Sequence, residues 1–274
     1  MSAGISKQAN RIDEKFSILN GERKKNLIVY ITAGYPDLAA TEKIIYALDL
    51  AGADIIELGI PFSDPVADGP TIQESGQYAL KKHINLAEIL KFASKVKPNI
   101  SAALTLMGYY NSILQFGLER FASSCAENGI DGIIIPDLIP EESAKLLKAA
   151  KAVGVKVIFF LAPTSDAARI KLVAEKSSGF IYCVTVAGIT GARTALPDFR
   201  KYVARVRKFT DKPIALGFGI SDAKLLRKVL KHADGAIVGS AVIKVITRNL
   251  HKKDLAEKTG SFVSQLRKGM NRPR

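Results

Sequence analysis

The sequence predicts a single-domain α/β protein, a closed (β/α)8 barrel of the TIM type. Short runs rich in Val and Ile alternate with longer segments of helical periodicity, from residue 27 to the C-terminal helix. This alternation is typical of a parallel sheet whose strands are joined by helices. Eight such units follow one another without a linker-like change in composition. A closed barrel accounts for this better than an open, doubly wound sheet does.

The predicted elements follow in order. The strands are expected at 27–32, 54–58, 101–106, 132–136, 156–161, 180–184, 213–216 and 235–238. Helices are expected at 38–52, 86–96, 118–129, 141–154, 166–177, 199–209, 222–232 and 253–269. An extra helix at 12–22 could cover the barrel floor. The domain would span 1–274 with its core at about 27–268, and with 1–10 and 269–274 frayed.

The composition favours a cytoplasmic globular protein. The chain has 274 residues, of which 47% are hydrophobic, enough to bury a large core. It contains no apolar run long enough to span a membrane, and its N-terminus lacks the apolar segment of a secretory signal. Cys125 and Cys183 match no metal-ligand spacing and are expected to be reduced core residues.

The charge is strongly asymmetric. The net charge is +14, and residues 1–137 hold 13 Lys and Arg against 16 Asp and Glu, while residues 138–274 hold 27 against 10. A basic half can indicate nucleic acid, an acidic partner or an anionic substrate. Here the cations fall at helical spacing without interleaved aromatic residues, which favours solvated helix faces over nucleic-acid binding.

The stretch ELGIPFSDPVADGP (57–70) carries the candidate chemistry. In such barrels the reacting groups lie where the strands end, on the loops that lead into the helices. Glu57 is the penultimate residue of its predicted strand, where burial would raise the pKa of its carboxyl group. The proline-rich loop can return Asp68 to face Glu57, which gives two carboxyl groups for acid and base catalysis. Asp64, before a proline, is interpreted as turn scaffolding.

Glycine-rich segments after the last two strands predict a phosphate site. GFGIS (217–221) runs into a helix, and GSAVIK (239–244) opens an extra short helix. Backbone N–H groups at such positions bind anions, and this is the usual phosphate position in these barrels. Residues 186–198 read as a loop that closes over substrate. The three histidines lie away from strand ends, and no metal site or nucleophile is predicted.

The motifs together resemble the tryptophan synthase α subunit family. ELGIPFSDPVADGPTIQ, TAGYPD (32–37), LMGYYN (106–111), GITGAR (188–193), GFGIS and GSAVIK match that family in order, over residues 11–268. The resemblance implies reverse-aldol cleavage of indole-3-glycerol phosphate to indole and glyceraldehyde 3-phosphate. By the same resemblance Glu57 is the acid/base residue and Asp68 binds the indole N–H group. One departure is Ala187, where family members often have a hydroxyl residue.

The resemblance also implies the contacts and partners. Tyr30, Met107, Tyr182 and Phe218 would lie near the indole, and Thr190 would reach toward Asp68 from the closing loop. The phosphate would be held by Gly191, Gly219, Gly239 and Ser240. This chain would carry no cofactor, whereas a partner β subunit in an α2β2 tetramer would carry pyridoxal phosphate and receive the indole. The interface would include parts of 61–78, 107–118 and 137–142.

Two alternatives stay open at this level. The first is another phosphate-binding barrel lyase or isomerase, such as an indole-glycerol-phosphate synthase, which would need a catalytic lysine at a strand end. The second is a non-catalytic regulatory subunit that only binds and activates a partner. Such a subunit would tolerate the loss of Glu57 or Asp68, and both are present.

Overall fold

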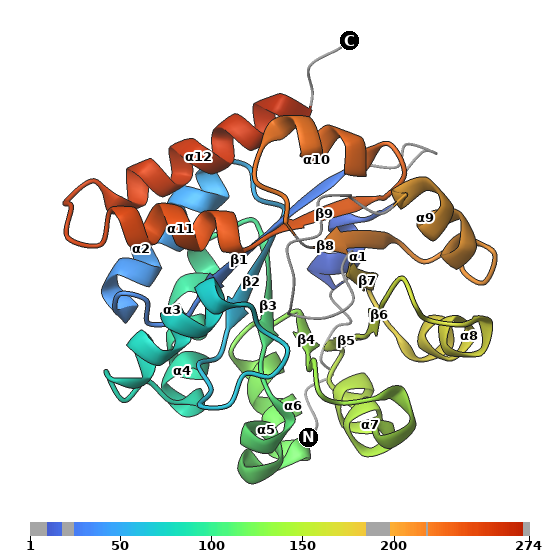
Figure 1. Cartoon of the computed structure of the whole chain (residues 1–274). Coiled ribbons are helices and arrows are strands. Elements are labelled where there is room, and N and C mark those ends of the chain that lie inside the picture. Colours follow the sequence, from blue (N-terminus) through green and yellow to red (C-terminus); the bar gives the residue numbers. More distant parts are fainter. Residues whose placement is uncertain (1–9, 18–24, 185–197, 218, 271–274) are drawn as a thin grey trace.

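The computed structural model describes residues 10–17, 25–184, 198–217 and 219–270 (Figure 1). The strands within these ranges are β1 (Asn26–Thr32), β2 (Ile55–Gly59), β3 (Ala103–Met107), β4 (Gly132–Ile134), β5 (Lys156–Ile158), β6 (Phe160–Leu161), β7 (Ile181–Val184), β8 (Ile214–Gly217) and β9 (Gly235–Val238). The helices are α1 (Arg11–Lys15), α2 (Leu38–Leu50), α3 (Pro70–Leu80), α4 (Leu86–Val96), α5 (Tyr110–Phe116), α6 (Leu118–Glu127), α7 (Ala144–Ala152), α8 (Ala167–Lys176), α9 (Phe199–Arg207), α10 (Ala223–Leu230), α11 (Ser240–Arg248) and α12 (Leu255–Met270), with 3-10 helices η2 (Lys97–Asn99) and η3 (Pro140–Glu142).

The strands form one parallel sheet in the order β5-β4-β3-β2-β1-β9-β8-β7-β6. Its two end strands are pieces of one predicted strand, 156–161, interrupted at Phe159. The first piece pairs with β4 and the second with β7, so this segment joins the two ends of the sheet. The helices surround the ring of strands, as a (β/α)8 barrel requires (Figure 1). The predicted fold class is therefore confirmed.

Strand register decides which side chains enter the barrel. Ile28 of β1 lies beside Ile55 of β2 and Ile237 of β9, and all three belong to a buried apolar cluster inside the barrel. The intervening residues, such as Leu27 and Val29, pack in a second cluster between strands and helices. Both faces of the strands are buried, which is why their sequences are continuously apolar rather than alternating.

Helix α1 fills the floor of the barrel. Ile12 and Phe16 are buried in the inner cluster, and the ring of Phe16 lies 5.4 Å from that of Phe180. The Asn10 side chain caps the helix by accepting the Ile12 N–H at 3.0 Å. The helix ends at Lys15, well short of the predicted 12–22, and residues 18–24 lie outside the described ranges.

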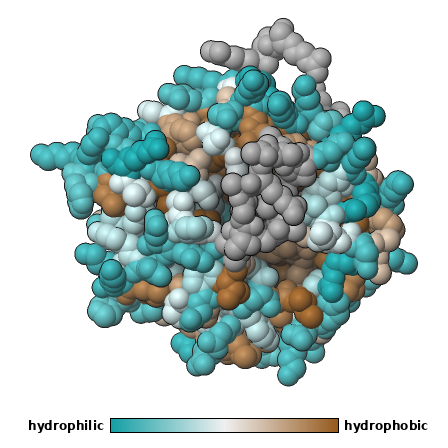
Figure 2. All heavy atoms as spheres, in the orientation of Figure 1, coloured by the Kyte–Doolittle hydropathy of each residue, from teal (hydrophilic) through white to brown (hydrophobic). Residues whose placement is uncertain are grey.

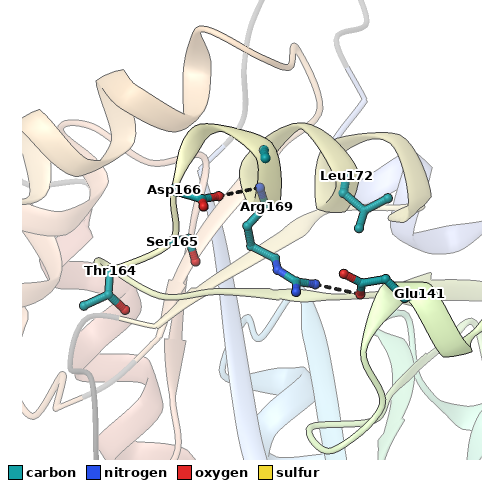
Figure 3. Close-up of a pocket in the computed structure, with 7 residues that line it drawn as sticks. Glu141, Thr164, Ser165, Asp166, Arg169 and Leu172 are labelled. Carbon is teal, nitrogen blue, oxygen red and sulfur yellow. Dashed lines mark hydrogen bonds and ion pairs between the residues drawn. The ribbon is translucent and has the colours of Figure 1, made fainter.

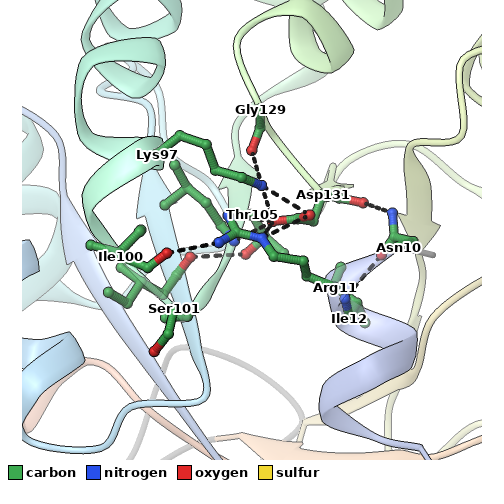
Figure 4. A network of polar contacts seen from close by, with 12 residues as sticks. Asn10, Arg11, Ile12, Lys97, Ile100, Ser101, Thr105, Gly129 and Asp131 are labelled. Atoms are coloured by element: carbon green, nitrogen blue, oxygen red, sulfur yellow. Dashed lines mark hydrogen bonds and ion pairs between the residues drawn. The ribbon is translucent and has the colours of Figure 1, made fainter. Parts of the chain in front are cut away.

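The buried carboxylate of Asp131 holds α1 in place at the floor of the barrel (Figure 4). Asp131, which precedes β4, accepts the Leu104 N–H at 2.8 Å. It also forms ion pairs with Arg11 of α1 and Lys97 of η2, each at 3.2 Å. The Asn10 amide completes the network by donating to the Asp131 carbonyl oxygen at 2.8 Å. Asp131 thus joins α1, η2 and β3 to the start of β4.

Two helices were not predicted, and several boundaries were wrong by one or two residues. Helix α3 begins at Pro70, the last residue of the predicted loop stretch 57–70, and proline is favoured at that first helical position. Helix α5 follows β3 directly. Strand β2 starts at Ile55, β3 starts at Ala103, and β4 ends at Ile134. The two cysteines are buried free thiols, as expected.

We expect Asp131→Asn to destabilise the fold. The amide cannot balance Arg11 and Lys97, so the free energy of unfolding should fall by about 2–3 kcal/mol. Urea denaturation measures this value. Glu42→Gln, which removes the exposed ion pair with Lys95, is the matched control and should change it far less. Equal effects in both variants would contradict the proposed importance of the floor network.

Candidate active site

Glu57 lies in the middle of β2 and points into the barrel. It is the third of five residues in the strand, one position earlier in the strand than predicted. Its register neighbours are Tyr30 of β1 and Thr105 of β3, one layer above the apolar cluster that contains Ile55. The side chain is 0% exposed, and neither carboxyl oxygen has a hydrogen-bond partner among the described residues.

This environment strongly disfavours the ionised form of Glu57. Burial, followed by repulsion from Asp68, raises the pKa of Glu57 to about 8. An unpaired carboxyl group in an apolar interior destabilises a fold, so its presence needs another explanation than packing. Strong pKa perturbation at the mouth of a barrel is typical of a catalytic acid.

Asp68 reaches the same region from the loop between β2 and α3. The loop is held by the Asp68 N–H, which donates to the Pro65 carbonyl at 3.0 Å, and by the Gln73 amide, which donates to the Asp68 carbonyl at 2.8 Å. The side chain is buried, and burial raises the pKa of Asp68 to about 6 although a hydrogen bond from Tyr109 opposes the shift. Asp64 is exposed and accepts the Ser63 hydroxyl, as turn scaffolding would.

Tyr109 is a site residue that the sequence reading missed. Its hydroxyl donates to Asp68 Oδ2 at 3.0 Å and accepts the Ala67 N–H at 3.0 Å. Its ring stacks on Phe62, with the centroids 4.9 Å apart and the planes at 17°. The phenol therefore holds the loop acid in place without any ligand. Its position directly after β3, in the quoted LMGYYN, was the available signal.

Tyr30 and Tyr182 lie in the same layer as Glu57. Tyr30 is beside Glu57 in the register, and the pKa of each phenol is raised well above its usual value by burial and the nearby carboxyl groups. Glycines make room for both rings. A Cβ atom on Gly217 would lie 2.6 Å from the Tyr182 ring, and one on Gly59 would overlap the Tyr30 hydroxyl. Tyr182 is the second of four residues in β7.

Some of the other predicted contact residues are described by the structure, and others are not. Met107 is the last residue of β3 and is half-buried against the inner cluster. Gly219 has a φ of 67°, and Gly239 and Ser240 open α11 directly after β9. The structure thus brings the carboxyl pair and the glycine segments to the same end of the barrel. Thr190, Gly191 and Phe218, like residues 186–197 of the predicted closing loop, lie outside the described residues.

A separate depression of about 440 Å³ lies between η3 and the start of α8 (Figure 3). Its charged groups are already engaged. Arg169 is paired with Glu141 at 2.7 Å, and Asp166 accepts the Arg169 N–H at 2.7 Å as the helix cap. We interpret it as a surface feature held by these local contacts. Within the described ranges, no helix is long and apolar enough to cross a membrane, and no group of three or more His, Cys, Asp or Glu residues could hold a metal ion.

The fold and the site define a class: a closed α/β barrel enzyme with a buried carboxyl pair at the end of the barrel where glycine segments follow β8 and β9. Comparison with known proteins gives the family. The tryptophan synthase alpha chain family matches residues 16–271. The chain is 46% identical to the tryptophan synthase alpha chain of Thermoanaerobacter sp. (strain X514), over 94% of this chain and 98% of that protein. It is 44% identical to that of Geobacter sp. (strain M21), over 95% and 98%.

Comparison with solved structures supports the same family. The tryptophan synthase alpha chain of Legionella pneumophila subsp. pneumophila superposes with a TM-score of 0.87 at 33% identity, covering 96% of this chain and 98% of that one. A chain of Mycobacterium tuberculosis tryptophan synthase gives 0.87 at 32% identity, over 97% and 100%. The chain belongs to the tryptophan synthase alpha chain family. It is a lyase of tryptophan biosynthesis, which excludes the alternative of an isomerase.

Glu57→Gln should stabilise the protein at alkaline pH. The pKa of Glu57 is about 8 in the folded state and near 4.5 when unfolded, so wild-type stability is full below pH 4.5 and declines as the pH rises through 8. The variant lacks this loss and should be more stable above pH 8 by up to about 5 kcal/mol, with little difference near pH 4.5. Thermal unfolding across this range tests it, and a pH-independent difference would contradict the pKa assignment.

Proposed function

We propose that this chain cleaves indole-3-glycerol phosphate to indole and glyceraldehyde 3-phosphate, with Glu57 and Asp68 as its catalytic residues. The observation that carries the proposal is the buried Glu57 carboxyl group, without a hydrogen-bond partner among the described residues and coupled to Asp68. With a pKa of about 8, Glu57 holds its proton near neutral pH, whereas Asp68, with a pKa of about 6, is mostly ionised. The two groups are suited to opposite tasks.

The reaction needs one proton delivered and one removed. Glu57 protonates indole C3, which leaves a cationic indolenine, and the Asp68 carboxylate accepts a hydrogen bond from the indole N–H and stabilises that charge. Loss of the proton from the adjacent glycerol hydroxyl, to the now ionised Glu57, breaks the carbon–carbon bond. The bonding electrons return to the ring as neutral indole, and the other fragment leaves as the aldehyde.

The remaining contacts divide by the two ends of the substrate. Tyr30, Met107, Tyr182 and Phe218 would enclose the flat indole. The N–H groups of Gly191, Gly219, Gly239 and Ser240 would hold the phosphate at the start of α11, where the helix dipole favours an anion. Thr190 would reach Asp68 when the loop closes.

The chain would work with a partner. We propose a tryptophan synthase β subunit in an α2β2 tetramer, with pyridoxal phosphate confined to that subunit. A relative supports this proposal, because a matching chain comes from a structure of Mycobacterium tuberculosis tryptophan synthase. The proposed location is the cytoplasm, and no nucleic acid or membrane takes part.

Glu57→Gln should abolish indole release, because the amide can neither donate nor accept the proton. Asp68→Asn should reduce kcat at least about 100-fold by removing the stabilising charge. Indole formation, measured with and without a β subunit, tests both variants. Retained binding of inorganic phosphate by Glu57→Gln is the control for folding. Near wild-type indole formation by Glu57→Gln would reject the acid/base role of Glu57, whereas no indole formation by the unaltered chain would favour a regulatory subunit.

Tyr109→Phe should shift the pH profile rather than abolish activity. Loss of the hydroxyl removes the hydrogen bond that lowers the pKa of Asp68, so the acidic limb of kcat/KM should move up by about half to one pH unit. Tyr110→Phe, at the neighbouring tyrosine, is the matched control. An unshifted profile for Tyr109→Phe would show that the phenol does not act through Asp68.

A further inference from the structure

The charged residues around the mouth of the barrel are sorted by sign. The connections after β1, β2, β3, β4 and β6 contain no Lys or Arg. They hold seven carboxylates: Asp37, Asp64, Asp68, Asp137, Glu141, Glu142 and Asp166. The first five residues of the helices that follow add two acids and four cations, which are Glu42, Glu74, Lys145, Lys148, Arg169 and Lys171. Arg169 is already paired with Glu141 at 2.7 Å. This side of the mouth is negative.

The opposite side carries cations. Arg200 and Lys201 lie in the first turn of α9, Lys224 in the first turn of α10, and Lys244 in the second turn of α11, and all four are exposed. Each helix of a barrel runs back from the mouth, so its first turns lie at the rim. Figure 1 shows α10 and α11 on the side of the ring opposite α5, α6 and α7. Figure 2 shows hydrophilic side chains spread over the same view.

We call these four cations, Arg200, Lys201, Lys224 and Lys244, the basic rim. Few acids lie near them to balance their charge. Asp198 and Asp222 lie nearby, but both act as helix caps and accept backbone N–H groups, of Lys201 at 3.2 Å and of Lys224 at 2.8 Å. Lys201 is 4.0 Å from Asp198. The other three rim cations form no ion pair within the described part of the chain. The rim keeps an excess of positive charge beside Gly219, Gly239 and Ser240.

We propose that this polarised mouth selects and orients a dianionic substrate, drawing its phosphate end to the basic rim and its uncharged ring toward Glu57 and Asp68. The inference rests on the proposed function, because it takes the phosphate to bind at the glycine segments. It assigns a role to exposed side chains that contact neither the reacting atoms nor the ring.

The sorting has a physical consequence for binding. An aligned dianion gains attraction at one end of the mouth and avoids repulsion at the other, whereas the reversed orientation does the opposite. The effect of an exposed charge spreads over about 10 Å at 0.1 M salt and shrinks as salt is added. Each rim cation should therefore change the affinity for a dianion by a factor of about two at low salt.

The test compares two triple variants that remove equal charge. The rim variant is Arg200→Gln, Lys224→Gln and Lys244→Gln. The control variant is Lys208→Gln, Lys231→Gln and Lys268→Gln, exposed residues after α9, after α10 and near the end of α12, away from the mouth. Indole formation from indole-3-glycerol phosphate is measured with the β subunit present, from about 0.02 to 0.5 M salt. Binding of inorganic phosphate is measured by calorimetry under the same conditions.

At low salt the rim variant should show a KM about five- to tenfold higher, with the difference vanishing at high salt, while the control variant stays within about twofold of wild type. Phosphate binding should weaken in the same order. Equal losses in both variants would show that only overall charge matters, and no loss in the rim variant would also overturn the inference. If the unaltered chain releases no indole, the proposed function fails, and the phosphate titration alone decides on the rim.

Discussion

The closure of a parallel sheet into a ring is the constraint on which the rest of the structure depends. Once the ring is closed, alternate residues of every strand point into a narrow interior from which solvent is largely excluded. In β2 this alternation sends Ile55 to the floor cluster and Glu57 to the next layer, beside Tyr30 and Thr105. The acid is therefore placed by the backbone register, and no flexible segment is needed to hold it.

The two acids of the site are held by different kinds of structure. Glu57 is fixed by its strand, whereas Asp68 belongs to a loop whose shape is set by Tyr109, Gln73 and a turn at Pro65. Burial raises the pKa of both carboxyl groups, and repulsion from Asp68 raises that of Glu57 further. Any change that lets water reach Glu57 would bring the two pKa values closer to ordinary ones and would weaken the division between proton donor and charged partner.

Much of the fold and part of the site were accessible from the sequence, for identifiable reasons. Continuous Val and Ile runs predicted the strands, and an acid within one of them predicted Glu57. Helix α3 was missed because Pro70 was read as a loop residue, although proline suits a first helical position. Tyr109 was missed because its role depends on the hydroxyl reaching Asp68, and neither residue type nor local spacing predicts that contact.

The interruption of the predicted strand 156–161 at Phe159 could not be predicted from the sequence either. Nothing in 156–161 indicates that its halves pair with different neighbours, because that division arises only when the ring closes. The sorted charges of the mouth are likewise invisible along the chain, where the acids of the first connections and the cations of the last helices are far apart. Both become evident when the two ends of the sheet meet.

The packed floor has a consequence for the movement of protons. Ile12 and Phe16 of α1, together with Ile28, Ile55 and Phe180, fill the lower end of the barrel with hydrocarbon. Such a layer offers a proton no chain of donors and acceptors to follow. Within the described part of the chain, the route left for proton exchange by Glu57 therefore runs through the mouth, by way of the substrate or of water that enters there. The barrel interior is thus open at the mouth and closed at the floor. While substrate fills the mouth, the proton that Glu57 gives to indole C3 is most directly replaced by the proton of the glycerol hydroxyl of the same molecule.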